Sequence, residues 1–146
     1  MILLGLDIGT VRIGVAKSDP LGMIASPFEV ISATDKSAVI KRLKDIVADE
    51  RVDKIIVGLP KRMDGTIAQA AEGVLAWVDC LKANVSIPVL THDERLSTKA
   101  AERALLEGDV SRKKRKQHID KVAAVVILQG YLDTHRAPAS EDPDYA

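Results

Sequence analysis

The stretch Ile2-Leu3-Leu4-Gly5-Leu6-Asp7-Ile8-Gly9 decides the fold of this 146-residue chain. A near-continuous apolar run of this length is typical of a strand that is buried on both faces, in the middle of a sheet. Asp7 is then expected near the carboxyl end of the strand, where α/β folds place their sites. Burying a bare carboxylate is costly, so Asp7 must be solvated, paired or bound to a cation. A plainer interpretation is that Asp7 only caps the turn at Thr10. Gly5, Gly9 and Gly14 leave the backbone open to the approach of a bulky group.

Composition limits the classes of function. The chain is 47% hydrophobic but only 3% aromatic, which favours an aliphatic α/β core over a stacking surface for single strands. Its 21 basic and 21 acidic residues balance, so the net charge does not indicate a polyanionic partner. Cys80 is the single cysteine, which excludes an internal disulfide and makes the cytoplasm the expected compartment. No apolar run has the length of a membrane span, so no membrane partner is expected.

Two more strands are expected directly after the first. Residues 12–19 alternate in polarity, and Asp19-Pro20-Leu21-Gly22 has the composition of a type I turn. The next strand is expected over about residues 23–31. Pro27 inside it lacks a backbone donor, which confines this strand to an edge of the sheet. The three strands together predict an antiparallel meander.

The rest of the chain alternates between helices and strands. Apolar spacing and short buried runs predict a helix over about 35–49, a strand over 54–59, a helix over about 64–81, a strand over 87–92, a short helix ending at Gly108 and a final helix over about 119–134. Residues 111–118 are polar and strongly basic. The segment 136–146 has no periodicity and is predicted to be a disordered tail, so we expect a single domain over residues 1–135.

These elements predict an α/β fold with a five-stranded mixed sheet and helices on both faces. With right-handed crossovers the expected strand order is 3-2-1-4-5, which puts the strand of residues 2–9 at the centre. This is the architecture of the ribonuclease H-like fold.

Acidic residues occur where three of these elements end or begin. They are Asp7, the pair Asp93-Glu94, and Asp120 at the start of the final helix. In the expected order they meet at one end of the sheet, where they would repel one another unless a divalent cation lay between them. Oxygen ligands without a histidine or cysteine cluster favour Mg²⁺ or Mn²⁺, and two such ions support hydrolysis of a phosphodiester. Asp120 alone could merely stabilise the amino end of its helix. Alternation along the strand does not choose between Asp93 and Glu94.

Five successive cations precede Asp120. They are Arg112, Lys113, Lys114, Arg115 and Lys116. Such a run is usually a solvated face, but beside a candidate metal site it is suited to contact a phosphate backbone. Arg62, just past the fourth strand, could reach the same substrate, and Arg12 and Arg95 are further candidates for nucleic-acid binding.

Four motifs, in this order, resemble the YqgF/RuvX family. They are Gly5-Leu6-Asp7-Ile8-Gly9 with Arg12-Ile13-Gly14-Val15-Ala16, Val57-Gly58-Leu59-Pro60 with Asp64-Gly65, Asp93-Glu94-Arg95-Leu96-Ser97-Thr98, and Asp120 with Ala123-Ala124 and Ile127-Leu128. The resemblance covers the chain except for its tail. It implies a bacterial, cytoplasmic, divalent-metal-dependent ribonuclease H-like nuclease that is related to Holliday junction resolvases and matures the precursor of 16S ribosomal RNA. It also implies a catalytic and metal-binding triad at Asp7, Glu94 and Asp120.

The sequence leaves several alternatives open. The substrate could be the ribosomal RNA precursor or branched DNA, and the cut could be endonucleolytic or exonucleolytic. The protein could be a monomer or a homodimer, and a symmetric cut of a two-fold junction would require the dimer. Asp7-Ile8-Gly9-Thr10 also looks like the first phosphate loop of the actin-like nucleotide-binding fold, although that fold needs two such domains. A non-catalytic nucleic-acid-binding module would leave the three acidic positions unexplained.

Overall fold

Five strands form one mixed sheet in the computed structural model, which describes residues 1–59, 69–93 and 112–135, with the backbone alone for 69–70 and 112–121. The sheet order is β3-β2-β1-β4-β5, as the sequence predicts. β1 pairs antiparallel with β2 and parallel with β4, which makes it the central strand. The strands are β1 (Leu3–Ile8), β2 (Arg12–Ser18), β3 (Ala25–Ser32), β4 (Lys54–Leu59) and β5 (Val89–Asp93).

β3 lies at one edge of the sheet, which confirms the position inferred from Pro27. The turn before it closes through a hydrogen bond from the Gly22 amide to the Asp19 carbonyl at 2.9 Å, with Gly22 at φ +67°. The Asp19 carboxylate also accepts from the amides of Ile24 and Met23, and these bonds hold the pKa of Asp19 below its ordinary value. Because the side chain extends the turn, β3 begins at Ala25, two residues later than predicted.

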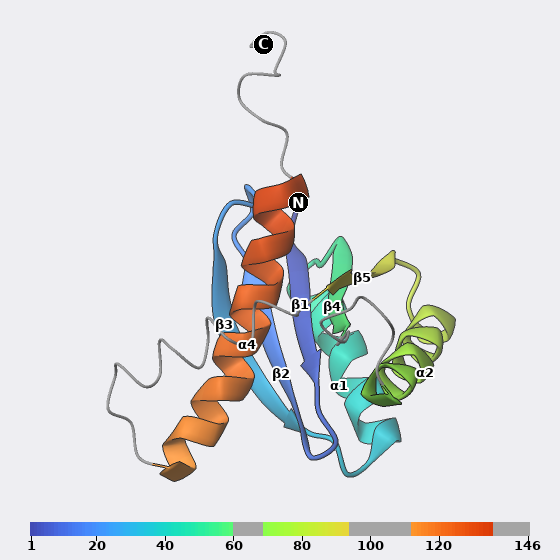
Figure 1. Ribbon diagram of the computed structural model, residues 1–146. Coiled ribbons are helices and arrows are strands. Elements are labelled where there is room, and N and C mark those ends of the chain that lie inside the picture. Colours follow the sequence, from blue (N-terminus) through green and yellow to red (C-terminus); the bar gives the residue numbers. More distant parts are fainter. Residues whose placement is uncertain (60–68, 94–111, 136–146) are drawn as a thin grey trace, which may run out of the picture.

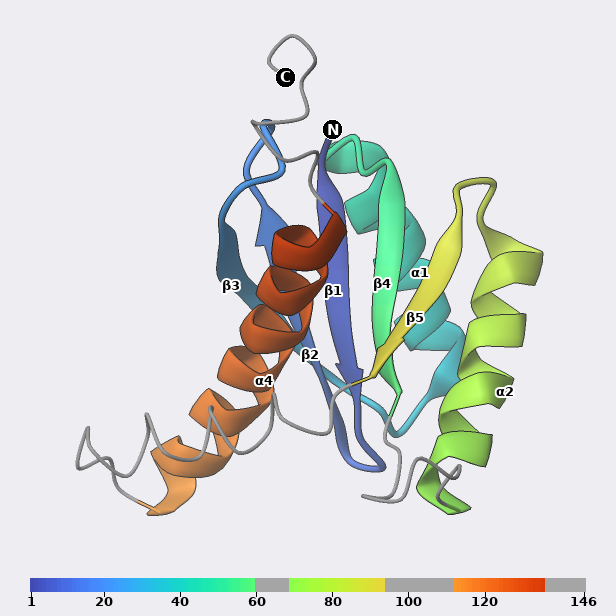
Figure 2. The same ribbon diagram turned by 45° about the horizontal axis from the view of Figure 1, so that its top comes forward.

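Helices cover both faces of the sheet (Figures 1 and 2). α1 (Lys36–Asp49) and α2 (Gln69–Asn84) lie on one face and bury their apolar stripes against residues such as Leu4 and Leu6 of β1. α4 (Arg112–His135) lies on the other face and packs on a smaller core that includes Leu3 and Ile56. The predicted start of α2 near residue 64, the short helix ending at Gly108 and the tail from 136 lie outside the described residues.

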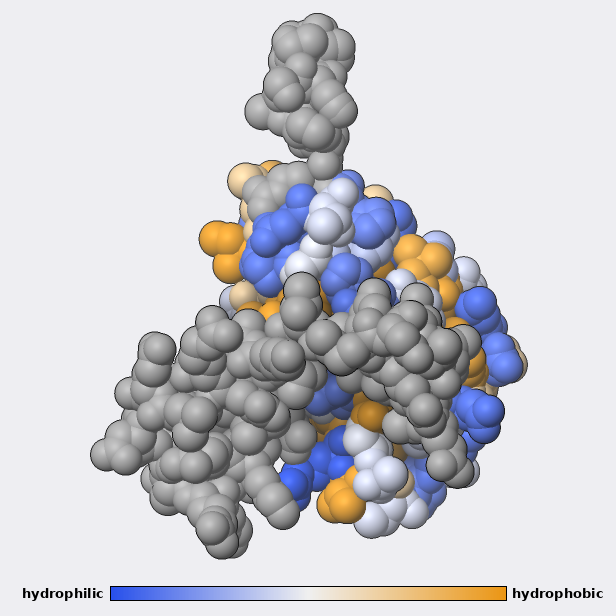
Figure 3. Space-filling view, viewed as in Figure 1, coloured by the Kyte–Doolittle hydropathy of each residue, from blue (hydrophilic) through white to orange (hydrophobic). Residues whose placement is uncertain are grey.

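α4 begins at Arg112, seven residues before the predicted start near residue 119. The prediction followed the apolar run, which marks only the part of the helix that packs on the sheet. Arginine, lysine and glutamine are good helix formers, so the backbone is helical before the packing begins. The first turns of α4 extend beyond the sheet, and hydrophilic side chains cover the outer side of its last turns (Figures 1 and 3). Among the described helices, none combines the length and apolarity that crossing a bilayer requires.

Gly5 lets α4 lie directly on the central strand. A Cβ atom at Gly5 would lie 2.6 Å from the Cβ atom of Leu128 and 3.1 Å from the carbonyl oxygen of Ala124, which is closer than packed atoms allow. The bulky group that approaches this glycine is therefore a helix. At Gly9 the neighbour is the Arg12 carbonyl, to which the Gly9 amide donates at 2.9 Å, so this glycine closes the β1–β2 turn.

Candidate active site at the carboxyl end of the sheet

Asp7 is the second-last residue of the central strand and is half-buried. Residues two apart on a strand share a face, so Asp7 lies on the same face as Leu3 and Gly5. Leu3 belongs to the core under α4, and Gly5 contacts α4 directly. Asp7 therefore lies on the α4 face of the sheet, at the carboxyl end that the sequence predicts.

The register of β5 separates its last two residues. His92 pairs with Gly58, two residues after Ile56 in the core under α4. His92 is accordingly on the α4 face, together with Asp7. Asp93 pairs with Leu59, which belongs to the core under α1 and α2. The sequence left Asp93 and Glu94 as alternatives, and this register argues against Asp93 as the partner of Asp7 because the two acids occupy opposite faces.

His92 links β5 to α4. A Cβ atom at Gly130 would lie 3.1 Å from the His92 Nε2 atom, so a glycine is needed for this approach. The His92 ring meets the Tyr131 ring edge-on at 6.2 Å between centroids, and Tyr131 in turn stacks on His135 at 4.0 Å. Burial lowers the pKa of His92, His135 lowers it further, and Asp93 opposes the shift. His92 is thus a packed histidine.

The direction of α4 brings Asp120 toward the same end of the sheet. Ala124 and Leu128 contact Gly5 in the middle of β1, and Tyr131 and the residues after it reach the amino end of that strand. α4 therefore runs opposite to β1, with its amino end toward Asp7. Asp120 is one turn before Ala124, on the same side of the helix. The backbone thus brings two of the three predicted acidic positions to one end of the sheet.

Glu94, Arg62 and Arg95 lie outside the described residues. Among the described side chains, no group of three or more histidine, cysteine or acidic residues could hold a metal ion. Arg12, at the start of β2, is half-buried beside the β1–β2 turn. The basic run occupies the first turns of α4, which extend from the sheet on the side of its edge strand β3 (Figures 1 and 2).

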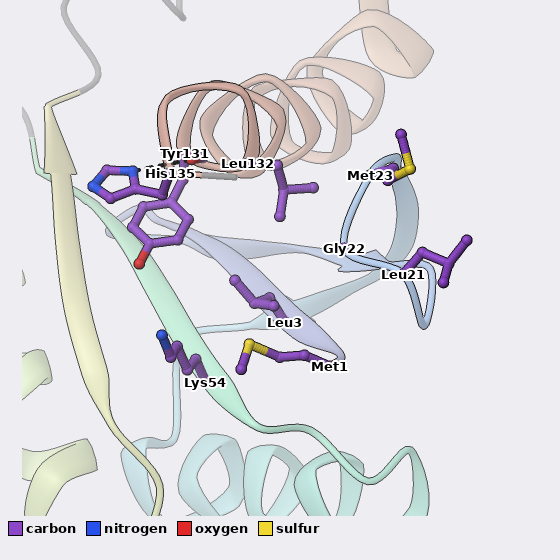
Figure 4. Close-up of a pocket in the computed structure, with 9 residues that line it drawn as sticks. All are labelled: Met1, Leu3, Leu21, Gly22, Met23, Lys54, Tyr131, Leu132 and His135. Carbon is purple, nitrogen blue, oxygen red and sulfur yellow. Dashed lines mark hydrogen bonds between the residues drawn. The ribbon is translucent and has the colours of Figure 1, made fainter. Parts of the chain in front are cut away.

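An apolar pocket lies at the opposite, amino end of the sheet (Figure 4). It measures about 390 Å³ and lies between α4, the start of β1 and the β2–β3 turn. Tyr131 and Leu132 line it from α4, and Lys54 directs its amine into it from β4. Leu21, 80% exposed, stands at its rim. The sequence does not predict this pocket, because its local signal is only a few apolar residues inside a turn.

Comparisons with known proteins find relatives that match nearly the whole chain. The profile of the RuvX family, described as "Holliday junction resolvase", matches residues 1–134. The chain is 52% identical over 136 residues to the "Putative pre-16S rRNA nuclease" of Geobacillus sp. (strain WCH70), covering 92% of this chain and 99% of the relative. It is 50% identical over 134 residues to the protein of the same name from Desulforamulus reducens, covering 92% and 98%.

Solved structures of resolvases share the fold. Thermus thermophilus RuvC in complex with Holliday junction substrate matches with a TM-score of 0.57 at 14% identity, over 92% of this chain and 96% of that one. The fowlpox virus Holliday junction resolvase matches with a TM-score of 0.56 at 13% identity, over 92% and 99%. At these identities the likeness shows the fold alone, which is the ribonuclease H-like architecture expected from the strand order.

Proposed function

The chain belongs to the RuvX family of Holliday junction resolvases, and on that premise we propose that it is a nuclease that cleaves phosphodiester bonds in the precursor of 16S ribosomal RNA. Relatives about half identical to it over nearly their whole length carry that activity in their names. The observation that carries the proposal is the placement of Asp7. It lies at the carboxyl end of the central strand, on the face covered by α4, whose amino end carries Asp120.

We infer that Asp7, Glu94 and Asp120 hold Mg²⁺ or Mn²⁺. Carboxylate oxygens are the ligands that these hard cations prefer, and Asp7 is a half-buried carboxylate at a strand end. The cation would supply Lewis-acid activation of the attacking water and of the leaving oxygen. Glu94 enters from the family resemblance, and the register that puts Asp93 on the other face supports this choice.

The basic residues would bind the substrate backbone. Phosphate contacts position a nucleic acid without reading its sequence. We assign this role to the run that opens α4, Arg112, Lys113, Lys114, Arg115 and Lys116, together with Arg12, Arg62 and Arg95. A helix that extends beyond the sheet, with its amino end toward Asp7, offers such cations to a strand entering the site. We also propose that the protein is cytoplasmic. Ribosomal RNA precursor is the proposed substrate, and a single cysteine suits a reducing compartment.

A second candidate function is resolution of Holliday junctions in DNA. The family description and the fold shared with RuvC favour it. The two functions use the same acids, so they differ in the shape of the nucleic acid and in the need for a two-fold dimer.

A cleavage assay with the purified full-length protein tests both functions. Precursor 16S RNA and a four-way DNA junction are offered separately in Mg²⁺, in Mn²⁺ and in EDTA, with Asp7→Asn as the control for contaminating nucleases. We expect RNA cleavage that requires the metal and Asp7. Cleavage of the junction alone would favour the second function. Binding of labelled ATP is titrated separately. Tight Mg²⁺-dependent ATP binding without cleavage of either nucleic acid would contradict both functions and favour the actin-like nucleotide-binding alternative.

A further inference from the structure

A groove of about 580 Å³ is lined by residues of α1 and α2. Both helices lie on the face of the sheet away from α4 (Figure 2). Lys36, Lys41 and Lys44 line it from α1, and Cys80 and Asn84 line it from α2. Three lysines in one groove are a local concentration of positive charge in a chain whose formal net charge is zero. None of the functions discussed above uses them.

Among the described residues, no carboxylate forms a salt bridge with a lysine of this groove. α1 carries one further cation, Arg42, and the Glu29 carboxylate accepts hydrogen bonds from its guanidinium at 2.9 and 2.6 Å. Within the part of the chain that the structure describes, neither Lys41 nor Lys44 lies within 4.0 Å of a carboxylate. Arg42 of α1 is thus paired with Glu29 of β3, whereas the α1 lysines that line the groove form no salt bridge with the described carboxylates.

Two further residues, Lys36 and Asp45, contribute to the net charge of the groove. The amine of Lys36 lies 4.9 Å from the centre of the Trp77 ring, which holds this cation at one end. Among the described residues that line the groove, Asp45 is the one acidic side chain. Glu29 is the main cause that raises the pKa of Arg42, and the charge of Asp45 adds to it. The groove thus keeps an excess of positive charge, which suits an anionic ligand.

The groove starts at the end of the sheet that carries Asp7. β3 ends beside the β1–β2 turn, where Arg12 pairs with Ser32 and the Ala33 amide donates to the Val11 carbonyl at 2.8 Å. α1 begins directly after this junction, so Lys36 is the groove lysine nearest to the candidate active site. From Lys36 to Lys44 the helix rises about 12 Å.

We propose that the α1–α2 groove binds the phosphate backbone of the substrate RNA on one side of the bond that is cleaved. The inference rests on the proposed function, because it gives the same substrate a second contact surface. The α4 run and the groove lie on opposite faces of the sheet, so together they would hold RNA on both sides of the carboxyl end. Lysines act here as point charges on phosphates, which gives affinity without sequence preference.

The test compares two double variants that remove the same charge. The double variant Lys41→Ala with Lys44→Ala removes two of the lysine charges that line the groove. Arg51→Ala with Lys82→Ala removes two exposed cations that do not line it. Binding of precursor 16S RNA is measured in EDTA at several salt concentrations, and cleavage is measured separately in Mg²⁺. Each lost phosphate contact flattens the slope of log affinity against log salt by about 0.9 on a duplex and about 0.7 on a single strand.

We expect the groove variant to flatten the slope by about 1.4 to 1.8 and the control pair to leave it unchanged. In Mg²⁺ the groove variant should raise KM and leave kcat unchanged, because no ligand of the reacting phosphate is altered. On an RNA trimmed close to the cleaved bond, on either side in turn, one trimming should abolish the difference from the wild type.

An unchanged slope in the groove variant, or equal flattening in both variants, would overturn the groove assignment while cleavage by the wild type still supported the proposed function. A defect of the groove variant that persisted on both trimmed RNAs would overturn the assignment as well. Absence of both RNA cleavage and RNA binding by the wild type would overturn the proposed function and the groove together.

Discussion

The two ends of β1 differ in chemistry although the same strand and the same helix form both. At the carboxyl end stand Asp7 and, across β4, the polar residues His92 and Asp93. At the amino end Leu3, Leu132 and Tyr131 surround an apolar pocket. The pocket is the more obvious hollow, yet it lacks the carboxylates that the proposed reaction needs. We therefore place the proposed reaction by position along the strand rather than by concavity, because α/β folds generally carry their sites at the carboxyl ends of strands.

The amino end has a structural role of its own. The Leu3 amide donates to the Ser18 hydroxyl at 2.8 Å, and the Ile2 amide donates to the Asp53 carboxylate at 2.8 Å. The terminal amine of Met1 donates to the Pro20 carbonyl at 2.7 Å. These bonds fix the start of the central strand, so that its far end can hold a charged residue in a defined place.

The largest difference between the two ends should appear when one charge is removed from each. Asp7→Asn keeps the shape of the side chain but removes a negative ligand. We expect cleavage of precursor RNA to fall at least about 100-fold, which corresponds to about 2.7 kcal/mol of transition-state stabilisation. Lys54→Ala, at the amino-end pocket, should leave the rate within about twofold. The measurement is kcat in Mg²⁺, with circular dichroism to show that both variants fold. Full activity of Asp7→Asn would contradict the metal mechanism.

The next effect concerns the two neighbouring acids at the end of β5. Because Asp7 is on the α4 face and Asp93 on the opposite face, Glu94→Gln should lower kcat about as much as Asp7→Asn does. Asp93→Asn should cost less than about tenfold, or 1.4 kcal/mol. The reverse ranking would keep the site at this end of the sheet but exchange the ligand.

Much of this arrangement could be predicted from the sequence because the determining signals are local. The buried run of β1 and the proline in β3 fix which strands lie at the centre and at the edge, and the short connections limit the topology. The face of the sheet that Asp93 occupies could not be predicted in this way. It depends on the pairing of β5 with β4, a contact between distant parts of the chain that no local pattern encodes. The early start of α4 was missed for a similar reason, since apolar spacing reports packing and not helix length.

A smaller effect on cleavage is expected from a substitution at Gly5, which lies between the two ends of β1. Gly5→Ala would force Leu128 and the Ala124 backbone away from β1. Such overpacking costs about 1–3 kcal/mol of unfolding free energy, and each kcal/mol lowers Tm by about 2–4 °C. Because α4 carries Asp120, kcat should also fall, but by less than in Asp7→Asn. Gly73→Ala is the matched control, since no described residue outside the neighbouring backbone of α2 lies within 4 Å of its Cβ position and alanine favours a helix. Equal stability of the two variants would contradict the close contact between β1 and α4.

The smallest effect on the chemical step is expected at the start of α4, where the basic run lies at the carboxyl end without supplying a metal ligand. Replacing Lys113, Lys114 and Lys116 together by alanine should flatten the slope of log affinity against log salt by about two to three units if all three contact phosphate. Cleavage at saturating substrate should fall little, because these lysines bind the backbone and take no part in bond breaking. The matched change at the amino end, Lys54→Ala, should leave the slope unchanged. An unchanged slope in the triple variant would make the run an ordinary solvated helix end, and the substrate path would then be sought through Arg12, Arg62 and Arg95.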